Sequence, residues 1–107
     1  MYAVKMTTVF EKKFRKIIPR ALHEQTLSRI RKLSRNPFVG KPLGDRHIRE
    51  LKVGKFRIYF LIFDAEVIVL LTDIGDKKNQ QEIIDFIKGQ RAQYEKCVKN
   101  LKESDCI

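Results

Sequence analysis

The sequence predicts a single α+β domain built on a twisted, antiparallel-rich sheet. Three observations support this fold class. The length of 107 residues suits one domain, and 43% of the residues are hydrophobic, which is enough for a buried core. Short alternating or apolar runs of strand length are separated by turn-forming residues, and other segments repeat apolar residues at helical spacing. The expected order is strand-helix-helix-strand-strand-strand-helix, and the whole chain, 1–107, is assigned to one domain.

The N-terminal third predicts one strand and two helices. Apolar and polar residues alternate over 2–7, as in a half-buried strand. Thr8 and Glu11 have capping-box spacing, which predicts a helix start, and Pro19 ends this helix. A second amphipathic helix follows and ends before Pro37. We expect these helices to pack on one face of the sheet and to leave part of the other face open.

The middle of the chain predicts a loop followed by a three-stranded meander. Residues 36–46 are rich in Gly, Pro, Asn and Asp, which favours a loop. Strands are expected over about 48–53, 56–63 and 67–72, with short turns between them. The continuous apolar character of the last two strands places them at the centre of the sheet.

A long final helix is expected after the sheet. Asn79 and Glu82 have the spacing of a helix cap, and helical periodicity continues through about Leu101. Its apolar stripe includes Ile83, Ile87 and Tyr94. We therefore expect residues 88–107 to form a C-terminal helical extension. Because an amphipathic helix must bury its stripe, we expect contact with the protein's own sheet or with a second copy in a homodimer.

The charge balance indicates a polyanionic partner. Lys and Arg number 23 against 13 Asp and Glu, a formal net charge of +10. Such a field attracts nucleic acid, acidic membranes or acidic proteins. No apolar run approaches the roughly 20 residues of a membrane span, and the N-terminus lacks signal-peptide features, so we expect a cytoplasmic protein without membrane contact. No P-loop or zinc-ligand spacing is present, and no cofactor or metal is expected.

A basic patch is expected on the open face of the sheet. Strand alternation turns Glu50, Lys52 and Arg57 away from the apolar face, while Lys77 and Lys78 follow the last strand. Two interpretations remain open at this point: a solvated strand face whose charges neutralise one another, and a phosphate-binding cleft.

Two sequence runs resemble the RelE/ParE superfamily of toxins. Residues 36–43 contain an NP…GKPL loop, and residues 49–59 contain a strand, a Val-Gly turn and an aromatic-Arg pair. The resemblance spans 2 to about 87, and some of its pieces are closer to the HigB branch. It implies a toxin that is held inactive by an antitoxin. The leading interpretation is a ribosome-dependent endoribonuclease that cuts mRNA in the A site. The alternatives are a ParE-like toxin that binds DNA gyrase and an inactive nucleic-acid-binding protein of this fold.

The resemblance also implies site residues. Arg57 matches the strand arginine of the ribonuclease members, Lys52 a basic position on the preceding strand, and Lys77 a catalytic cation near the end of the last strand. The chain departs from the family pattern at Glu50, where many members have a basic residue, and at Ile83, near a catalytic tyrosine of some members. The flanking cations expected to bind RNA are Lys41, Arg46, Arg49, Lys55 and Lys78.

RNA cleavage by its own 2′-OH needs a base, an acid and charge stabilisation at the phosphate. Arg57 would stabilise the phosphate, since a guanidinium can bind two phosphate oxygens. Glu50 or Lys52 would act as the base and Lys77 as the acid, which makes these four the expected catalytic residues. Tyr59 could stack on a base, although strand packing is the simpler role, and His47 lies next to the patch in sequence.

Overall fold

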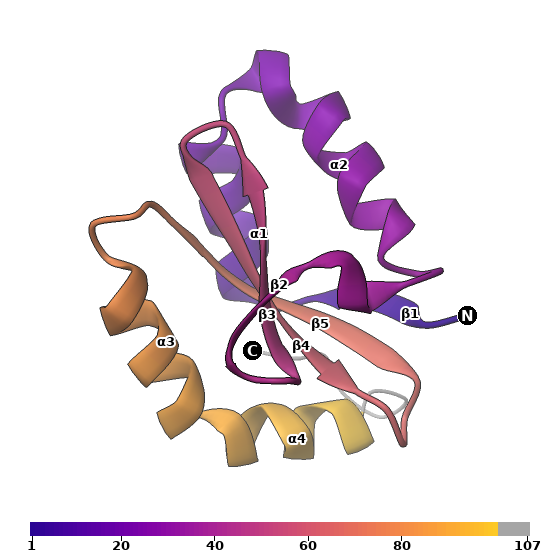
Figure 1. The fold of residues 1–107 in the computed structure, drawn as a ribbon. Coiled ribbons are helices and arrows are strands. Elements are labelled where there is room, and N and C mark those ends of the chain that lie inside the picture. Colours follow the sequence, from indigo (N-terminus) through magenta and orange to yellow (C-terminus); the bar gives the residue numbers. More distant parts are fainter. Residues whose placement is uncertain (101–107) are drawn as a thin grey trace.

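The computed structural model describes residues 1–100 (Figure 1). Its five strands are β1 (Ala3–Met6), β2 (Lys41–Asp45), β3 (Ile48–Val53), β4 (Phe56–Phe63) and β5 (Ile68–Gly75). Its four α-helices are α1 (Thr8–Ile17), α2 (His23–Lys32), α3 (Gln80–Gly89) and α4 (Arg91–Lys99). Single 3₁₀ turns occur at Arg20–Leu22 and Pro37–Val39. The α+β class is confirmed, with one more strand and one more helix than the sequence predicts.

The strands form one mixed sheet in the order β1-β5-β4-β3-β2. β1 lies parallel to β5 at one edge, and the remaining neighbours are antiparallel. The β3–β4 turn is tight because Gly54 adopts a φ of 57°, a left-handed conformation that glycine accepts without strain. β4 and β5 lie at the centre of the sheet, as their apolar sequences predict.

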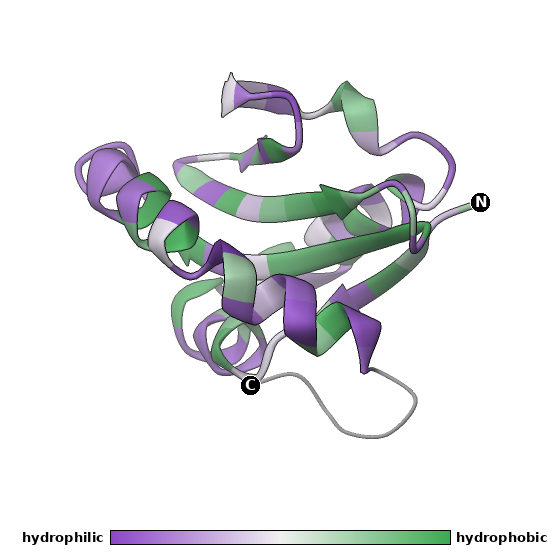
Figure 2. Ribbon diagram, turned by 90° about the horizontal axis from the view of Figure 1, so that it is seen from below, coloured by the Kyte–Doolittle hydropathy of each residue, from purple (hydrophilic) through white to green (hydrophobic). Residues whose placement is uncertain are grey.

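Helices cover both faces of the sheet (Figure 1). The expectation of one helical face holds for α1 and α2 only, which pack Phe10 and Ile30 against the face that carries Phe60. On the opposite face α3 and α4 cover Tyr59 and Leu61. The long strands at the centre are largely hydrophobic, whereas hydrophilic residues are frequent on the helices (Figure 2). Strands that are apolar on both faces need a cover on each side, which explains the second helical layer.

Three local features differ from the sequence prediction. Residues 41–45 form the short edge strand β2 rather than a loop, since backbone pairing with β3 does not need β-forming side chains. The cap of α1 is Thr7 and not Thr8, and its side chain accepts a hydrogen bond from the Phe10 amide. The final helix is interrupted at Gln90, directly after Gly89, so α3 and α4 meet at an angle (Figure 1).

The break in the final helix keeps its apolar stripe on the protein. Ile83 and Ile87 are buried and Tyr94 is half-buried against the sheet. The stripe therefore has a partner within the chain, as one of the two expectations had it. The predicted continuation to Leu101 lies outside the described residues. No helix in residues 1–100 has the length and apolar character needed to cross a bilayer.

Candidate nucleic-acid interface

A basic cleft opens beside the end of β3, where β2 begins. Its volume is about 340 Å³. The cleft is lined by Arg29, Val39, Lys41, Glu50, Leu51, Lys52 and Arg57. Four of these side chains are cationic and one is a carboxylate, so the cleft carries a clear excess of positive charge.

Strand pairing explains why these residues meet. β2 begins with Lys41 opposite Glu50, so the last three residues of β3 have no neighbouring strand on that side. The two-residue turn between β3 and β4 sets Lys52 directly opposite Arg57. An exposed edge of sheet and a cross-strand pair of cations therefore lie together.

Glu50 and Arg57 form a buried ion pair at the back of the cleft. Arg57 Nη1 donates to Glu50 Oε1 at 2.8 Å, and the two side chains are only 13% and 2% exposed. Gln80, at the start of α3, donates to the other carboxylate oxygen at 3.0 Å. The expectation that Glu50 and Arg57 lie on an open face is wrong, because α3 covers this part of the sheet. Both oxygens of Glu50 already accept a hydrogen bond, so its arrangement suits holding Arg57 better than accepting a proton.

Lys52 and Lys41 are the exposed cations of the cleft, and Arg29 is partly exposed. Lys77 and Lys78 are also exposed and lie in the turn before α3, but they do not line the cleft. They are nevertheless at the same end of the sheet, because β5 ends at Gly75 opposite Arg57. These four lysines are free to meet a polyanion that crosses this end of the molecule.

The remaining predicted RNA-binding cations lie elsewhere. Arg49 donates to the carbonyls of Phe38 at 2.9 Å and Gly40 at 2.7 Å, so it holds the loop before β2. Arg46 stacks on the Phe38 ring, with its guanidinium carbon 4.6 Å from the ring centroid. Lys55 is exposed in the β3–β4 turn, with its Nζ 5.4 Å from the centroid of the Phe56 ring. None of the three lines the cleft.

Three residues that line the cleft were not among the site residues expected from the sequence: Arg29, Val39 and Leu51. Arg29 belongs to the polar side of α2 in the sequence pattern, and its arrival at the cleft depends on tertiary packing. Its Nη1 donates a hydrogen bond to the Lys52 carbonyl. Val39 is 62% exposed and gives the cleft an apolar wall. In the sequence, only its position between Pro37 and Lys41, in a loop of turn-forming residues, could have indicated that Val39 lies at the cleft.

Tyr59 does not contribute to a binding surface. Its ring is fully buried among apolar side chains beneath α3 and α4, so it cannot stack on a base. Burial raises the pKa of the Tyr59 phenol to about 12, and the negative charge of Glu50 adds to this effect. The hydroxyl group has no hydrogen-bond partner.

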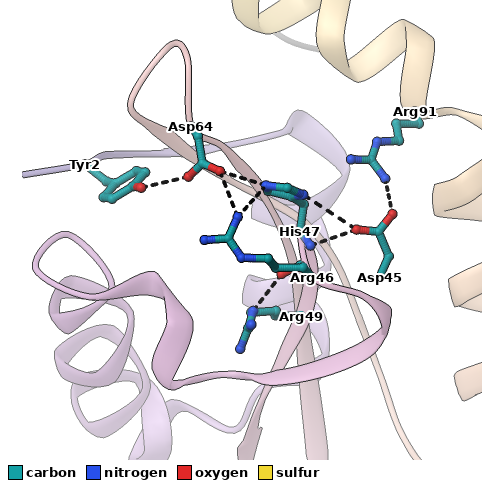
Figure 3. Close-up of polar contacts among 7 residues, drawn as sticks. All are labelled: Tyr2, Asp45, Arg46, His47, Arg49, Asp64 and Arg91. Atoms are coloured by element: carbon teal, nitrogen blue, oxygen red, sulfur yellow. Dashed lines mark hydrogen bonds and ion pairs between the residues drawn. The ribbon is translucent and has the colours of Figure 1, made fainter.

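A second polar cluster lies at the opposite end of β3 (Figure 3). His47 Nε2 is 2.7 Å from Asp64 Oδ2, and its Nδ1 is 3.7 Å from Asp45 Oδ1. Tyr2 donates to Asp64 at 2.8 Å, and Arg91 pairs with Asp45 at 2.5 Å. A carboxylate therefore lies beside each ring nitrogen of His47, and the ring links Asp45 to Asp64.

The two carboxylates of this cluster are held in their charged form. The hydrogen bond from His47 is the main cause that lowers the pKa of Asp64, followed by the one from Tyr2. The backbone N–H of His47 is the main cause that lowers the pKa of Asp45, which also receives a hydrogen bond from Arg91. These contacts join the segment directly before β1, the end of β2 with the β2–β3 turn, the β4–β5 turn and α4. Within residues 1–100 no group of three or more His, Cys, Asp or Glu could hold a metal ion.

Residues 4–81 match the sequence profile of the family described as ParE toxin of type II toxin-antitoxin system, parDE. This match covers well over half of the chain. The chain belongs to this family, within the RelE/ParE superfamily, and is the toxin of a toxin–antitoxin module. A search of curated proteins found no match for this toxin.

Solved structures with the same fold include both free and antitoxin-bound toxins. The toxin is 28% identical to a chain of the toxin-antitoxin complex RelBE2 from Mycobacterium tuberculosis, with a TM-score of 0.58 over 71% of this chain and 91% of that one. It is 18% identical to the isolated Escherichia coli RelE toxin, with a TM-score of 0.63 over 81% of this chain and 99% of that one. It is 19% identical to a chain of the intact E. coli RelBE complex, with a TM-score of 0.62 over 71% and 96%. The last two likenesses concern the fold alone.

Proposed function

We propose that this toxin inhibits translation by binding and cutting mRNA in the ribosomal A site. The observation that carries the proposal is the cleft beside β3, where Arg29, Lys41, Lys52 and Arg57 face a single carboxylate. Phosphate groups supply most of the affinity of a protein for RNA, and a concave cationic surface suits a single strand. Val39 adds an apolar wall against which a ribose or a base can pack.

The contacts of the cleft divide the chemistry among its residues. The ion pair with Glu50 fixes the Arg57 guanidinium, which is then preorganised to stabilise charge on a phosphate. The exposed Lys52, in its neutral amine form, is the remaining candidate for the base that takes the 2′-OH proton. Lys77 would deliver a proton to the leaving 5′-oxygen from the turn that precedes α3. Glu50 thus changes from a candidate base to a positioning residue.

A ParE-like action on DNA gyrase is the second candidate function. It is favoured by the family profile, which is that of ParE toxins, and by the engagement of both Glu50 oxygens, which removes one candidate base. Such a toxin would need no cleavage chemistry, and its cleft would serve as a contact surface.

Pulse labelling after induction of the toxin distinguishes the two functions. If the toxin cuts mRNA, incorporation of amino acids falls first, and primer extension on an abundant mRNA reveals new 5′ ends. If it acts on gyrase, incorporation of thymidine falls first and the mRNA stays intact. The second result would contradict the proposal.

A matched pair of substitutions tests the cleft. We expect Lys52→Ala to abolish growth arrest while the protein keeps its melting temperature, because the side chain is exposed. Lys12→Ala removes the same charge from an exposed position on α1 and should leave toxicity intact. Equal toxicity of the two variants would exclude the cleft as the active surface.

We also propose that an antitoxin protein holds this toxin inactive in the cytoplasm. Two of the similar structures are of toxin–antitoxin complexes, and the net charge of +10 favours an acidic partner segment. Co-expression with the product of an adjacent short reading frame should restore growth, and the two proteins should co-purify. If growth arrest persists during co-expression with the product of each adjacent reading frame, the proposed antitoxin partner is contradicted.

A further inference from the structure

Arg29 reaches the basic cleft from the opposite side of the sheet. Its helix, α2, belongs to the layer that covers the face of Phe60, whereas Glu50 and Arg57 lie on the face covered by α3. The Arg29 side chain passes the free edge of β3 and donates to the Lys52 carbonyl. This route exists because β2 begins opposite Glu50 and leaves the rest of that edge uncovered.

The hydrogen bond to Lys52 leaves most of the Arg29 guanidinium available. A guanidinium carries five N–H groups in a fixed plane, and the carbonyl accepts from one nitrogen. The others remain for an anion in the cleft, where Lys41 and Lys52 add positive charge. The backbone carbonyl therefore acts as a fixed point that orients a second set of donors.

We propose that Arg29 is a phosphate-binding residue of the cleft, positioned by the Lys52 carbonyl, and that a single RNA strand crosses the sheet at the free edge of β3. This inference rests on the proposed function and adds the path that the RNA takes across the toxin. Cations from both helical layers then contact one backbone. A lysine at this position could not hold the carbonyl and a phosphate at once in a fixed geometry, since its ammonium group is a point charge on a flexible stem.

Binding of a short single-stranded RNA with 2′-O-methyl groups tests the inference, because that RNA resists cleavage by its own 2′-OH. Fluorescence anisotropy would be measured at several salt concentrations on Arg29→Ala, Arg29→Lys, Lys52→Ala and Arg31→Ala. Arg31 is the matched control, since it is exposed on the same helix and lies outside the cleft. Melting temperatures of all variants would be recorded beside the binding data.

We expect Arg29→Ala to weaken binding by about tenfold, as for loss of a charge-assisted hydrogen bond. The slope of log K against log salt should fall by about 0.7, which corresponds to one phosphate contact with a single strand. Arg29→Lys should lie between Arg29→Ala and the parent protein, and Arg31→Ala should match the parent. If Arg29→Ala lowers the melting temperature strongly, RNA binding by Arg29→Lys, which keeps the charge, is compared with that of the parent and of Arg31→Ala instead.

Two outcomes would overturn the inference, and they can be told apart. If Lys52→Ala weakens binding while Arg29→Ala and Arg29→Lys behave like Arg31→Ala, Arg29 has no role and the RNA function stands. If the parent protein does not bind the RNA at any salt concentration, this inference fails, whereas the proposed function is decided separately by pulse labelling and primer extension.

Discussion

At the scale of single residues, the ion pair of Glu50 and Arg57 determines how mutations in the cleft must be interpreted. We expect Arg57→Ala to destabilise the fold by about 3–5 kcal/mol, because it leaves a nearly inaccessible carboxylate without its cation. The sequence alone predicts an exposed arginine and a nearly neutral effect. Urea unfolding measures the difference, with Lys52→Ala as an exposed control on the facing strand. A stability equal to that of the control would show that the pair contributes nothing to the fold.

Removing the Tyr59 hydroxyl group should stabilise the fold, in contrast to the loss of Arg57. Tyr59→Phe should raise stability at neutral pH by up to about 1–3 kcal/mol, because it removes a buried polar group that has no partner. Since the folded protein raises the pKa of Tyr59 from 10 to about 12, the parent loses stability as the pH rises between these values. The phenylalanine variant should lose less over that window. Urea unfolding at pH 7 and pH 11 measures both effects, and a less stable variant at both values would refute the assignment.

Gly40 is required by a close approach of the chain to the core. A Cβ atom there would lie 2.6 Å from Cζ of the buried Phe60 ring and 2.9 Å from the Glu50 carbonyl oxygen. We expect Gly40→Ala to cost about 1–3 kcal/mol through overpacking. Gly89→Ala is the control, since nothing lies within 4 Å of its Cβ position, and it should stabilise by up to about 1 kcal/mol through helix propensity. Thermal unfolding of both variants tests this prediction. Melting temperatures that shift in the same direction for Gly40→Ala and Gly89→Ala would contradict it.

At the scale of elements, periodicity predicts the structure where local signals suffice. The bounds of β3 and β4 agree with the sequence because Gly54 fixes the turn between them. β2 could not be found this way, since its strand character comes from pairing with β3.

The cleft was predicted only in part for a similar reason. Lys52 follows from strand alternation and Lys41 from the family resemblance, but the arrival of Arg29 and the cover of Glu50 depend on where helices dock.

The polar cluster around His47 joins four elements, and it should be sensitive to acid. Because the folded state lowers the pKa of Asp64, its contribution to stability is present above the ordinary value of 3.8 and is lost as the pH falls through the lowered value. Asp64→Asn should therefore lose less stability than the parent below about pH 4. The difference should stay below about 1 kcal/mol, since the side chain is well exposed. Urea unfolding from pH 6 to pH 2 measures it, with Glu24→Gln on α2 as the exposed control. Parallel curves for parent and Asp64→Asn would exclude a contribution of this contact.

At the scale of the whole molecule, one sheet separates two hydrophobic cores. Among residues 1–100 the core under α1 and α2 has more buried residues, and the core under α3 and α4 is built from side chains of the opposite face. The matched part of the family profile ends at residue 81, so α4 lies beyond it. This toxin thus completes its second core with residues outside the shared family region, and Val98 is 3% exposed there.

A chain that ends at Lys88 should therefore be less stable than the full chain and should self-associate. It loses Val98, the packing of Tyr94 and Cys97, and the ion pair of Arg91 with Asp45, which uncovers apolar side chains of the sheet. Sedimentation velocity and urea unfolding measure the two effects. Val98→Ala in the full chain isolates the packing contribution of α4 and should cost about 1–3 kcal/mol. A monomeric short form with the stability of the full chain would show that α4 is not part of the core. A full chain that sediments as a dimer would instead support the homodimer that the length of the final helix predicts.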